Sequence, residues 1–492
     1  MSIDSKSKLI RILSVAGDVT TVFLSVIISF RISGIYTDIC NVTVGYGLAF
    51  VIAVVFSFIM LDLYSLKAEN IYNALISAGI SVLIAYFCVY VLSRIVRVQQ
   101  LPIIFWSYLL AILMPAELVW RMIVAFAKKK TGQKRSLLII ENMKNTSRLA
   151  RKLKYASNEE NRSWYHMLDE TDDDEMQTLL NKMLPKFDAV FISSHISNKV
   201  AEKILFKALT IGKEANILAD VDGVTTLKGR IYQIDDTPAI VKKGIHLTKF
   251  QKTVKRSFDI LIALIGSIVT LPVILICAAA IKLDSKGPVF YKQERYTINK
   301  KVFNVYKLRT MFTDAEKNGA QFATENDPRI TRVGRVLRAL RLDELPQIYN
   351  ILAGSMSVVG PRPERPVFAD EFSKAIASYD MRYCLKAGLT GYAQVYGKYN
   401  TRVSDKILMD ITYGTTYSLL LDVKLILLTI KIMFMKSATQ GVDEEYDANL
   451  SAPDKEAGRR ASSKRFMEYI KDIDQSKEEK NNEKNIRDYS GV

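Results

Sequence analysis

Cysteine and histidine are scarce in this chain. Its 492 residues include four cysteines and three histidines, and none of them form a C-x-x-C or similar close pair. Disulfide frameworks and structural zinc sites need such residues at short, regular spacing, so the sequence argues against both. We expect buried free thiols instead. The residues are Cys40, Cys88, Cys277, Cys384, His166, His195 and His246.

Acidic residues are outnumbered by basic ones. The chain has 68 Lys and Arg against 51 Asp and Glu, which gives a formal net charge of +17. Such an excess suits nucleic acid, anionic lipid or a phosphorylated substrate. Because no nucleic-acid-binding motif is present, we expect no nucleic-acid partner and favour lipid headgroups and a phosphate-bearing substrate. With 49% hydrophobic and 24% charged residues, the chain is expected to join membrane segments to a soluble part.

Four long apolar segments open the chain, and each can span a hydrocarbon core of about 30 Å. Cations precede the first segment and follow the fourth, so the positive-inside rule places both ends in the cytoplasm. No cleavage pattern of a signal peptide is present, so the first segment is interpreted as a retained helix. Residues 1–127 are thus predicted to form a four-helix transmembrane domain. The segments are Ile10–Phe30, Val44–Leu61, Ala74–Leu92 and Leu101–Phe126.

Two acids, Asp18 and Glu117, lie within or near these segments. Intramembrane carboxylates can mark an ion path. Both acids lie near segment ends or neighbouring cations, which favours a structural role over transport.

Residues 128–250 alternate between short apolar runs and helical patterns, which indicates a Rossmann-like α/β domain with a parallel sheet. The first strand is followed by the sequence ENMKNT (residues 141–146), which contains no glycine. Without glycine the backbone does not easily approach a pyrophosphate. This degenerate glycine turn favours a structural or regulatory module over a dinucleotide site. The expected strands are Ser136–Ile140, Asp188–Ile192 and Ala215–Ala219, and the expected helices are Asn145–Tyr155 and Lys199–Ile211.

The apolar stretch Phe258–Leu283 has cations on both flanks, which favours keeping both ends in the cytoplasm. Pro272 lies near its middle, where it removes a backbone hydrogen bond and bends a helix. We therefore expect a re-entrant helix–break–helix hairpin with Pro272 as its structural hinge; the alternative is a fifth, kinked span. A later segment, Leu419–Met435, is expected to lie on the membrane surface. Residues 441–492 are charged and are expected to be disordered.

Carboxylates and arginines gather between these two apolar stretches. The sequence DELPQ (residues 343–347) places Asp343 and Glu344 just ahead of a proline in the first turn of an expected helix. Acids at a helix start also stabilise the helix dipole, but that explains one acid and not the arginines nearby. Two adjacent carboxylates among cations suit a phosphate ester handled through a metal ion. The neighbouring motifs are KLRTM (307–311), DPRITRVGR (327–335) and MSVVGPRPE (356–364).

The order and wording of these motifs resemble the large monotopic phosphoglycosyl transferases, the bacterial polyprenyl-phosphate hexose-1-phosphate transferase family. The resemblance implies that residues 251–440 form a monotopic α/β catalytic domain with a re-entrant helix. It also implies transfer of a hexose-1-phosphate from a UDP-sugar to undecaprenyl phosphate, with release of UMP. In that reaction Asp343 would be the nucleophile that forms a covalent aspartyl-phosphosugar intermediate. Glu344 would be the ligand of a Mg²⁺ cofactor.

Further residues are expected to bind substrate. Arg362 matches the family's phosphate-binding arginine, whose guanidinium can hold two phosphate oxygens. Asp410 matches a late carboxylate of the family. The sequence KAGLTGY (386–392) keeps the family's glycines but lacks its proline and tryptophan. Two further pairs of cations are candidates, and for each the alternative is an exposed surface charge. Lys307 and Arg309 match a family pair after a strand, and Arg335 and Arg338, three residues apart, would share one helix face.

These interpretations together describe an enzyme that initiates exopolysaccharide, capsule or O-antigen synthesis. It is expected on the cytoplasmic face of a bacterial inner membrane, with a UDP-hexose and undecaprenyl phosphate as partners. Glucose and galactose are the leading sugars, and the α/β module could support a homodimer. The alternative is a catalytically silent scaffold or nucleotide sensor of the same fold.

Overall fold

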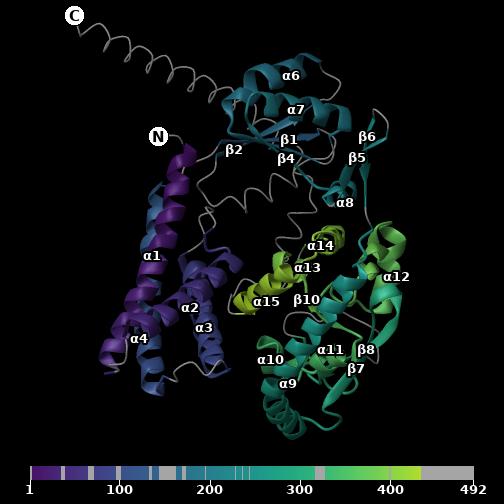
Figure 1. Cartoon of the computed structure of the whole chain (residues 1–492). Coiled ribbons are helices and arrows are strands. Elements are labelled where there is room, and N and C mark those ends of the chain that lie inside the picture. Colours follow the sequence, from purple (N-terminus) through teal and green to yellow (C-terminus); the bar gives the residue numbers. More distant parts are fainter. Residues whose placement is uncertain are drawn as a thin grey trace, which may run out of the picture. The chain divides into compact units, whose positions relative to one another are not determined.

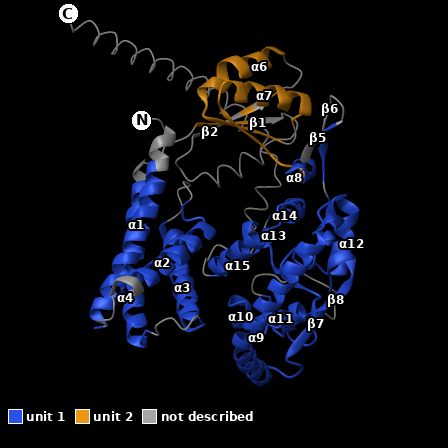
Figure 2. Cartoon of the chain, in the orientation of Figure 1, with its two compact units in different colours: residues 1–130, 221–442 blue, residues 131–220, 443–492 orange. Residues whose placement is uncertain are grey.

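A computed structural model describes most of the chain, and Figure 1 labels its helices and strands. The chain divides into two compact units, residues 1–130 with 221–442 and residues 131–220 with 443–492 (Figure 2). The expected boundary at residue 250 falls inside the first unit, and the expected tail 441–492 lies outside the described residues. Those are 3–34, 39–64, 71–95, 101–131, 136–142, 162–168, 173–193, 196–227, 229–234, 237–242, 244–315, 327–397 and 401–433.

Long apolar helices form the N-terminal part of the first unit. Their buried side chains gather around Trp106, whose ring centroid lies 5.0 Å from that of Tyr90 and 5.7 Å from that of Tyr86. Many outward-facing leucines and isoleucines are exposed, as expected where lipid rather than water is the solvent. The protein is therefore a membrane protein. The helices are α1 (Ile3–Ile32), α2 (Ile39–Met60), α3 (Ile71–Ile95) and α4 (Ile103–Thr131).

A cluster of charged side chains is buried among these helices. Arg121 on α4 pairs with Asp18 on α1, and Tyr64 donates a hydrogen bond to the same carboxylate at 2.5 Å. The guanidinium of Arg121 also lies 4.1 Å from the centre of the Phe58 ring. Glu117, a second acid among these helices, lies in electrostatic range of both Asp18 and Arg121. Asp18 and Glu117 thus share the guanidinium of Arg121.

The second unit is built on a parallel sheet with strand order β2-β1-β3-β4. The expected parallel pairing is observed, and Leu138 pairs with Val190 between β1 and β3. Helix α7 (Asn198–Thr210) packs its buried Ile204 and Ala208 into the core of this unit. Helix Asn145–Tyr155 and most of the expected glycine-free turn lie outside the described residues. The strands are β1 (Ser136–Asn142), β2 (Arg162–Leu168), β3 (Ala189–Ile192) and β4 (Glu214–Ile217), and a short helix α6 (Asp173–Thr178) precedes β3.

Helix α9 (Lys249–Asp284) begins at a capping box in which Thr248 and Gln251 exchange side-chain and backbone hydrogen bonds. The helix continues through Pro272, so the expected interruption of the helix at this residue is not observed. A helix in apolar surroundings resists breaking, because each freed backbone group would lack a partner. The re-entrant path itself stays a prediction.

Five helices in the described part of the chain are long and apolar enough to cross a membrane, α9 and the four N-terminal ones. Helix α15 (Leu419–Met433), expected on the membrane surface, is not among them. It buries Asp422, Leu425, Leu428 and Lys431.

The rest of the first unit forms a mixed α/β body against α9. Its core brings together apolar residues of α9, α11, α14 and α15, among them Ala263, Ile351, Ile411 and Leu425. Strands β7 (Phe290–Tyr296) and β8 (Val302–Leu308) form an antiparallel hairpin. The other elements are α8 (Val221–Thr226), β5 (Arg230–Ile234), β6 (Thr237–Val241), α10 (Arg332–Ala339), α11 (Gln347–Ala353), β9 (Ser357–Val359), α12 (Pro366–Ala375), β10 (Gly388–Thr390), α13 (Tyr392–Tyr396) and α14 (Val403–Thr415).

Candidate active site

Asp343 and Glu344 lie in a short 3-10 turn, Leu342–Glu344, directly before α11. The turn begins after Arg341, whose positive φ of 57° turns the chain sharply from α10. Pro346 is the N-cap of α11, close to the first-turn position expected for it. The two carboxylates are thus held at a helix start, as the sequence indicated.

Glu344 is surrounded by cations. Its Oε1 lies 3.1 Å from Nη2 of Arg362 and 3.5 Å from Nζ of Lys307. Burial alone would raise the pKa of Glu344, but Arg362 and Lys307 outweigh it and lower the pKa to about 2. Glu344 is therefore ionised at any physiological pH.

The neighbouring Asp343 has a different environment. Burial raises its pKa above the ordinary value, and the negative charge of Glu344 adds to this. Lys307 and Arg338 oppose both effects. A carboxylate with a raised pKa keeps more of its basicity, which suits a nucleophile better than a salt-bridged partner.

A pocket opens at Glu344 and carries more positive than negative groups; Asp343 is next to Glu344 in the sequence but is not among the lining residues. Burial lowers the pKa of Lys307, which stands near the end of β8. Arg295 at the end of β7 also lines the pocket, and burial lowers its pKa to about 10. Three cations facing one carboxylate suit a polyanionic ligand. The pocket is lined by Arg295, Val305, Lys307, Glu344, Gln347, Arg362 and Pro363.

Arg295 and Gln347 were not found by sequence reasoning. Arg295 lies 67 positions before Arg362 and outside the motif KLRTM. The antiparallel register of β7 and β8 pairs it with Phe303. Because side chains alternate along a strand, the sequence YKQERY indicates which of its side chains share a face with Arg295. The sequence alone does not indicate which face turns toward the pocket, because that depends on the register with β8.

Arg309, expected to bind substrate, instead contacts main-chain carbonyls of the protein itself. It is buried and donates through Nη1 to the carbonyl of Lys286 at 2.7 Å and through Nη2 to that of Ser285 at 2.8 Å. It thus satisfies carbonyls just past the end of α9. These contacts favour a structural role for Arg309, and its expected contact with substrate stays a prediction.

Arg335 and Arg338 differ although both lie on α10. Arg338 is half-buried and acts electrostatically on Asp343, whereas Arg335 is exposed. The structure therefore brings one of the two expected helix-face arginines to the acid pair.

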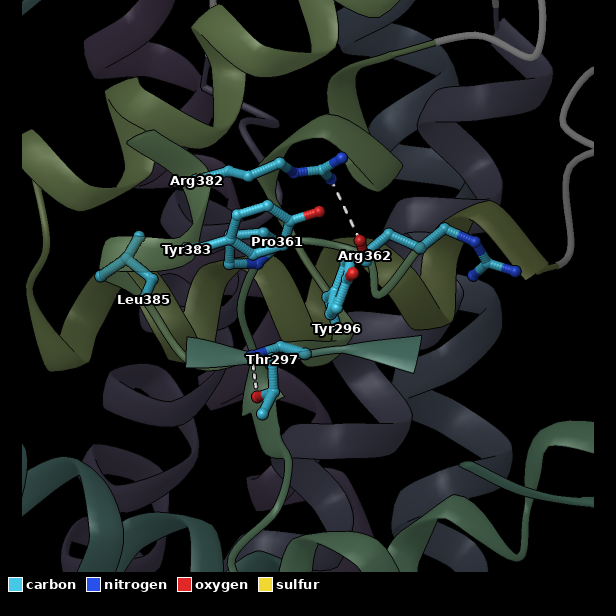
Figure 3. Close-up of a pocket in the computed structure, with 8 residues that line it drawn as sticks. Tyr296, Thr297, Pro361, Arg362, Arg382, Tyr383 and Leu385 are labelled. Carbon is cyan, nitrogen blue, oxygen red and sulfur yellow. Dashed lines mark hydrogen bonds between the residues drawn. The ribbon is translucent and has the colours of Figure 1, made fainter. Parts of the chain in front are cut away.

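Asp410 on α14 is also buried, and its nearest charged partner is Arg382, at 2.9 Å. Burial raises the pKa of Asp410 to about 6, against the lowering effect of Arg382. It is not among the residues that line the pocket at Glu344. Figure 3 shows Arg382 in a neighbouring pocket, next to the main chain of Arg362.

The loop that carries Arg362 is packed closely against β10 (Gly388–Thr390), which lies within the sequence KAGLTGY. The backbone of Gly360 donates to the carbonyl of Thr390 at 2.8 Å, and Gly388 donates to that of Pro361 at 2.9 Å. A Cβ at Gly360 would lie 2.2 Å from the carbonyl oxygen of Lys386, so only glycine fits. Ala387 in place of the family's proline uses its free N–H, which donates to Oγ1 of Thr297 at 3.2 Å.

Asp343 and Glu344 offer carboxylate oxygens, the kind of ligand that a hard divalent cation prefers. No group of three or more His, Cys, Asp or Glu that could hold a metal occurs within the residues that the structure describes. Mg²⁺ commonly takes one or two protein carboxylates and completes its shell with water and phosphate oxygens. Glu344, beside Asp343, could supply such a protein carboxylate.

These observations define a membrane protein with an acid pair at a cationic pocket, on a body packed along a long apolar helix. A protein-family model described as "Bacterial sugar transferase" matches residues 250–436, which contain the whole pocket. The chain is similar to curated proteins of the same kind.

Three relatives illustrate the likeness. A "UDP-N-acetylgalactosamine-undecaprenyl-phosphate N-acetylgalactosaminephosphotransferase" of Aeromonas hydrophila is 44% identical over 181 residues, 36% of this chain and 43% of that protein. A "UDP-glucose:undecaprenyl-phosphate glucose-1-phosphate transferase" of Klebsiella pneumoniae is 35% identical over 250 residues, 49% of this chain and 54% of that protein. The "Exopolysaccharide production protein PSS" of Rhizobium leguminosarum bv. phaseoli is 38% identical over 185 residues, 36% of this chain and 92% of that protein.

The match spans about half the length of the first two relatives and nearly the whole of the third. The chain belongs to the bacterial sugar transferase family.

Proposed function

We propose that the protein transfers a sugar-1-phosphate from a UDP-sugar to undecaprenyl phosphate and releases UMP. The observation that carries the proposal is the pocket in which Glu344 is paired with Lys307 and Arg362 beside Asp343. It lies in the part of the chain that matches the family. The curated relatives named above act, by their names, on UDP-sugars and undecaprenyl phosphate.

The reaction proceeds in two displacements. A carboxylate oxygen of Asp343 attacks the β-phosphorus of the UDP-sugar, and the bond from that phosphorus to the bridging oxygen breaks, so UMP leaves with the oxygen. A phosphate oxygen of the lipid then attacks the same phosphorus, and the bond to Asp343 breaks. Covalent catalysis divides one difficult displacement into two easier ones.

The obstacle to the first step is repulsion between an anionic nucleophile and a diphosphate. Lys307 and Arg362 supply fixed positive charge in the pocket, and Arg338 acts on Asp343 from α10. Glu344 would hold Mg²⁺, which when bound neutralises phosphate charge. The two acids then have separate roles: Asp343 reacts, and Glu344 stays an ionised ligand.

The re-entrant course of α9 is supported by its contacts with one body at both ends. Near its start, Arg256 donates to the carbonyls of Ile351 and Leu352 at 2.6 and 2.8 Å. At its end, Asp284 accepts from the backbone of Val333 at 3.2 Å. In between, Ile274 and Ile281 are buried against the same α/β body. A polar body does not cross the hydrocarbon core, so both ends of α9 belong on one side of the membrane. Because cations flank α9 at both ends, we propose that this side, with the pocket, is the cytoplasmic face of the inner membrane.

The pathway and the sugar follow from relatives rather than from the pocket. A relative named for exopolysaccharide production favours an initiating step in exopolysaccharide, capsule or O-antigen synthesis. The relatives are named for both glucose and N-acetylgalactosamine, so the donor class is a UDP-hexose with or without an acetamido group. A homodimer supported by the α/β unit stays a prediction.

The test is UMP release from a panel of UDP-sugars by the full chain in nanodiscs, with undecaprenyl phosphate and Mg²⁺. We expect one or two UDP-hexoses to give UMP and a glycolipid product in equal amounts. A folded protein that releases no UMP from any donor would support the alternative, a scaffold or nucleotide sensor of the same fold.

A further inference from the structure

The loop Gly360–Glu364 contains two prolines, Pro361 and Pro363, which have no N–H to donate. Its shape must therefore be fixed largely through its carbonyl oxygens. Four consecutive carbonyls each accept a hydrogen bond. Pro361 accepts from the backbone of Gly388 at 2.9 Å, Arg362 from Nη2 of Arg382 at 3.0 Å, Pro363 from Nη1 of Arg295 at 3.1 Å and Glu364 from the backbone of Tyr296 at 3.1 Å.

Two of these four contacts come from arginine side chains. Arg295 also lines the pocket at Glu344, so its charge can act on a ligand directly. Arg382 does not line that pocket, and it reaches Arg362 only at the main chain. In Figure 3 the guanidinium of Arg382 lies above the carbonyl of Arg362, while the Arg362 side chain points away from it.

Arg382 is itself held rigidly. It is 6% exposed, and its Nη1 donates to the hydroxyl of Tyr379 at 3.1 Å. Its guanidinium carbon lies 5.3 Å from the centre of the Tyr379 ring. The Nη2 atom that holds the Arg362 carbonyl is also 2.9 Å from the carboxylate of Asp410, which is 1% exposed.

A buried guanidinium needs a buried counter-charge, because an isolated charge in this environment is costly. Asp410 supplies it from α14. The pair Arg382–Asp410 thus joins α14 to the loop that carries Arg362, and Arg362 in turn reaches Glu344 with its side chain.

We propose that Arg382 is a positioning residue for the transfer reaction, that it acts through the main chain of Arg362, and that Asp410 is its counter-ion rather than a substrate ligand. The inference rests on the proposed function. Arg382 fixes the direction in which the Arg362 guanidinium leaves the loop, and hence its place against the phosphates of the donor. Small displacements of such a group reduce rates by about 100-fold.

The test is a double-mutant cycle with Arg382→Lys and Arg362→Gln, measured as kcat/KM for the UDP-sugar. Lysine keeps the charge beside Asp410, but a single ammonium cannot hold the carbonyl, the carboxylate and the Tyr379 hydroxyl together. We expect Arg382→Lys to lower kcat/KM by about 10- to 100-fold in the parent. In the Arg362→Gln background the same change should cost less than about 3-fold, because the group it positions is already gone.

Arg256→Lys is the matched control. Arg256 also donates to two main-chain carbonyls, but at the C-terminal end of α11, opposite to Gln347. The fold-change in kcat/KM caused by Arg256→Lys should be the same in the parent and in the Arg362→Gln background, as expected for independent sites. If Arg382→Lys also multiplies fully with Arg362→Gln, Arg382 does not act through Arg362 and the inference is overturned.

Two further arms keep the outcome clear. If Arg382→Lys does not fold, Asp410→Asn replaces it in the cycle, with the same expected loss of effect in the Arg362→Gln background. If the parent releases no UMP from any donor, the proposed function fails. The cycle is then read in the Kd of UDP by calorimetry, and multiplying effects there contradict the inference as well.

Discussion

Two of the groups of acids with arginine that the structure describes in the first unit differ in charge and access. In the N-terminal helices, Asp18 and Glu117 are 0% exposed and share Arg121, which is covered by Phe58 and Tyr64. At the pocket, Asp343 and Glu344 are half-buried and face Lys307, Arg338 and Arg362.

The difference shows what separates a structural charge cluster from a reactive one. The cluster of Asp18, Glu117 and Arg121 has no surplus of positive charge and no exposed member, so it has nothing to offer an anionic ligand. The pocket has more cations than its acids need, and the side chain of Arg362 is 41% exposed. We therefore expect changes in the first cluster to alter stability and changes in the second to alter turnover.

The largest effect is expected for Asp343→Asn. The variant keeps the size of the side chain but loses the nucleophile, so UMP release should fall by about 1000-fold or more. Thermal unfolding should stay near that of the parent, because Asp343 makes no ion pair at the distances that hold Glu344. Near-parental turnover in this variant would remove Asp343 from the nucleophilic role.

A smaller loss is expected for Glu344→Gln, of about 100-fold in kcat. The amide keeps the shape but binds Mg²⁺ poorly, so the Mg²⁺ concentration needed for half-maximal turnover should rise. Excess chelator should abolish turnover in the parent. Turnover that continues unchanged in chelator would contradict the assignment of Glu344 as a metal ligand.

Next come the two arginines of α10. Arg338→Gln should lower kcat/KM by about 10-fold, whereas Arg335→Gln should change it by less than about 2-fold. Loss of the Arg338 charge should also raise the pKa of Asp343, because that charge lowers it in the parent. Since the nucleophile must be ionised, the acid limb of the pH–rate profile should move to higher pH in Arg338→Gln and stay in place in Arg335→Gln. Equal effects of the two changes would show that the pocket does not distinguish them.

The smallest effect on turnover is expected in the N-terminal helices. Arg121→Met leaves Asp18 without its cation, which should cost about 3 kcal/mol of stability. Turnover per folded molecule should remain within about 3-fold of the parent, since Arg121 lies outside the pocket. The control is Arg11→Met at an exposed position of α1, which should change neither property. A larger loss of turnover than of stability in Arg121→Met would mean that the cluster serves the reaction.

Hydropathy and spacing predicted the elements that depend on local pattern. Each of the four expected apolar segments overlaps a long helix, and the strands β1, β3 and β4 and helix α7 lie within a few residues of their expected positions. Strand β2 (Arg162–Leu168) was missed, because its sequence RSWYHML has no regular alternation and its place is set by pairing with β1. Pro272 predicted a break, but α9 continues through this residue.

The candidate site likewise contains residues that local sequence motifs predicted and residues that only tertiary contacts placed. The motif around Asp343, Glu344 and Arg362 could be read from the sequence, because those residues meet within one short turn and one loop. Whether a cation of a motif turns toward the pocket or inward depends on tertiary contacts, which placed Arg309 at the end of α9. Arg382 could not be found at all, since the Arg362 carbonyl and the Asp410 carboxylate lie 20 and 28 positions away and only the folded chain brings them together.

The most direct test of the account is the first half-reaction in isolation. The full chain is mixed with a radiolabelled UDP-sugar and Mg²⁺ without undecaprenyl phosphate, UMP is counted, and the protein is digested for mass spectrometry. We expect a burst of about one UMP per active site and a phosphosugar on Asp343 that disappears when undecaprenyl phosphate is added. Release of UMP only when the lipid acceptor is present, with no adduct on Asp343, would contradict the covalent route.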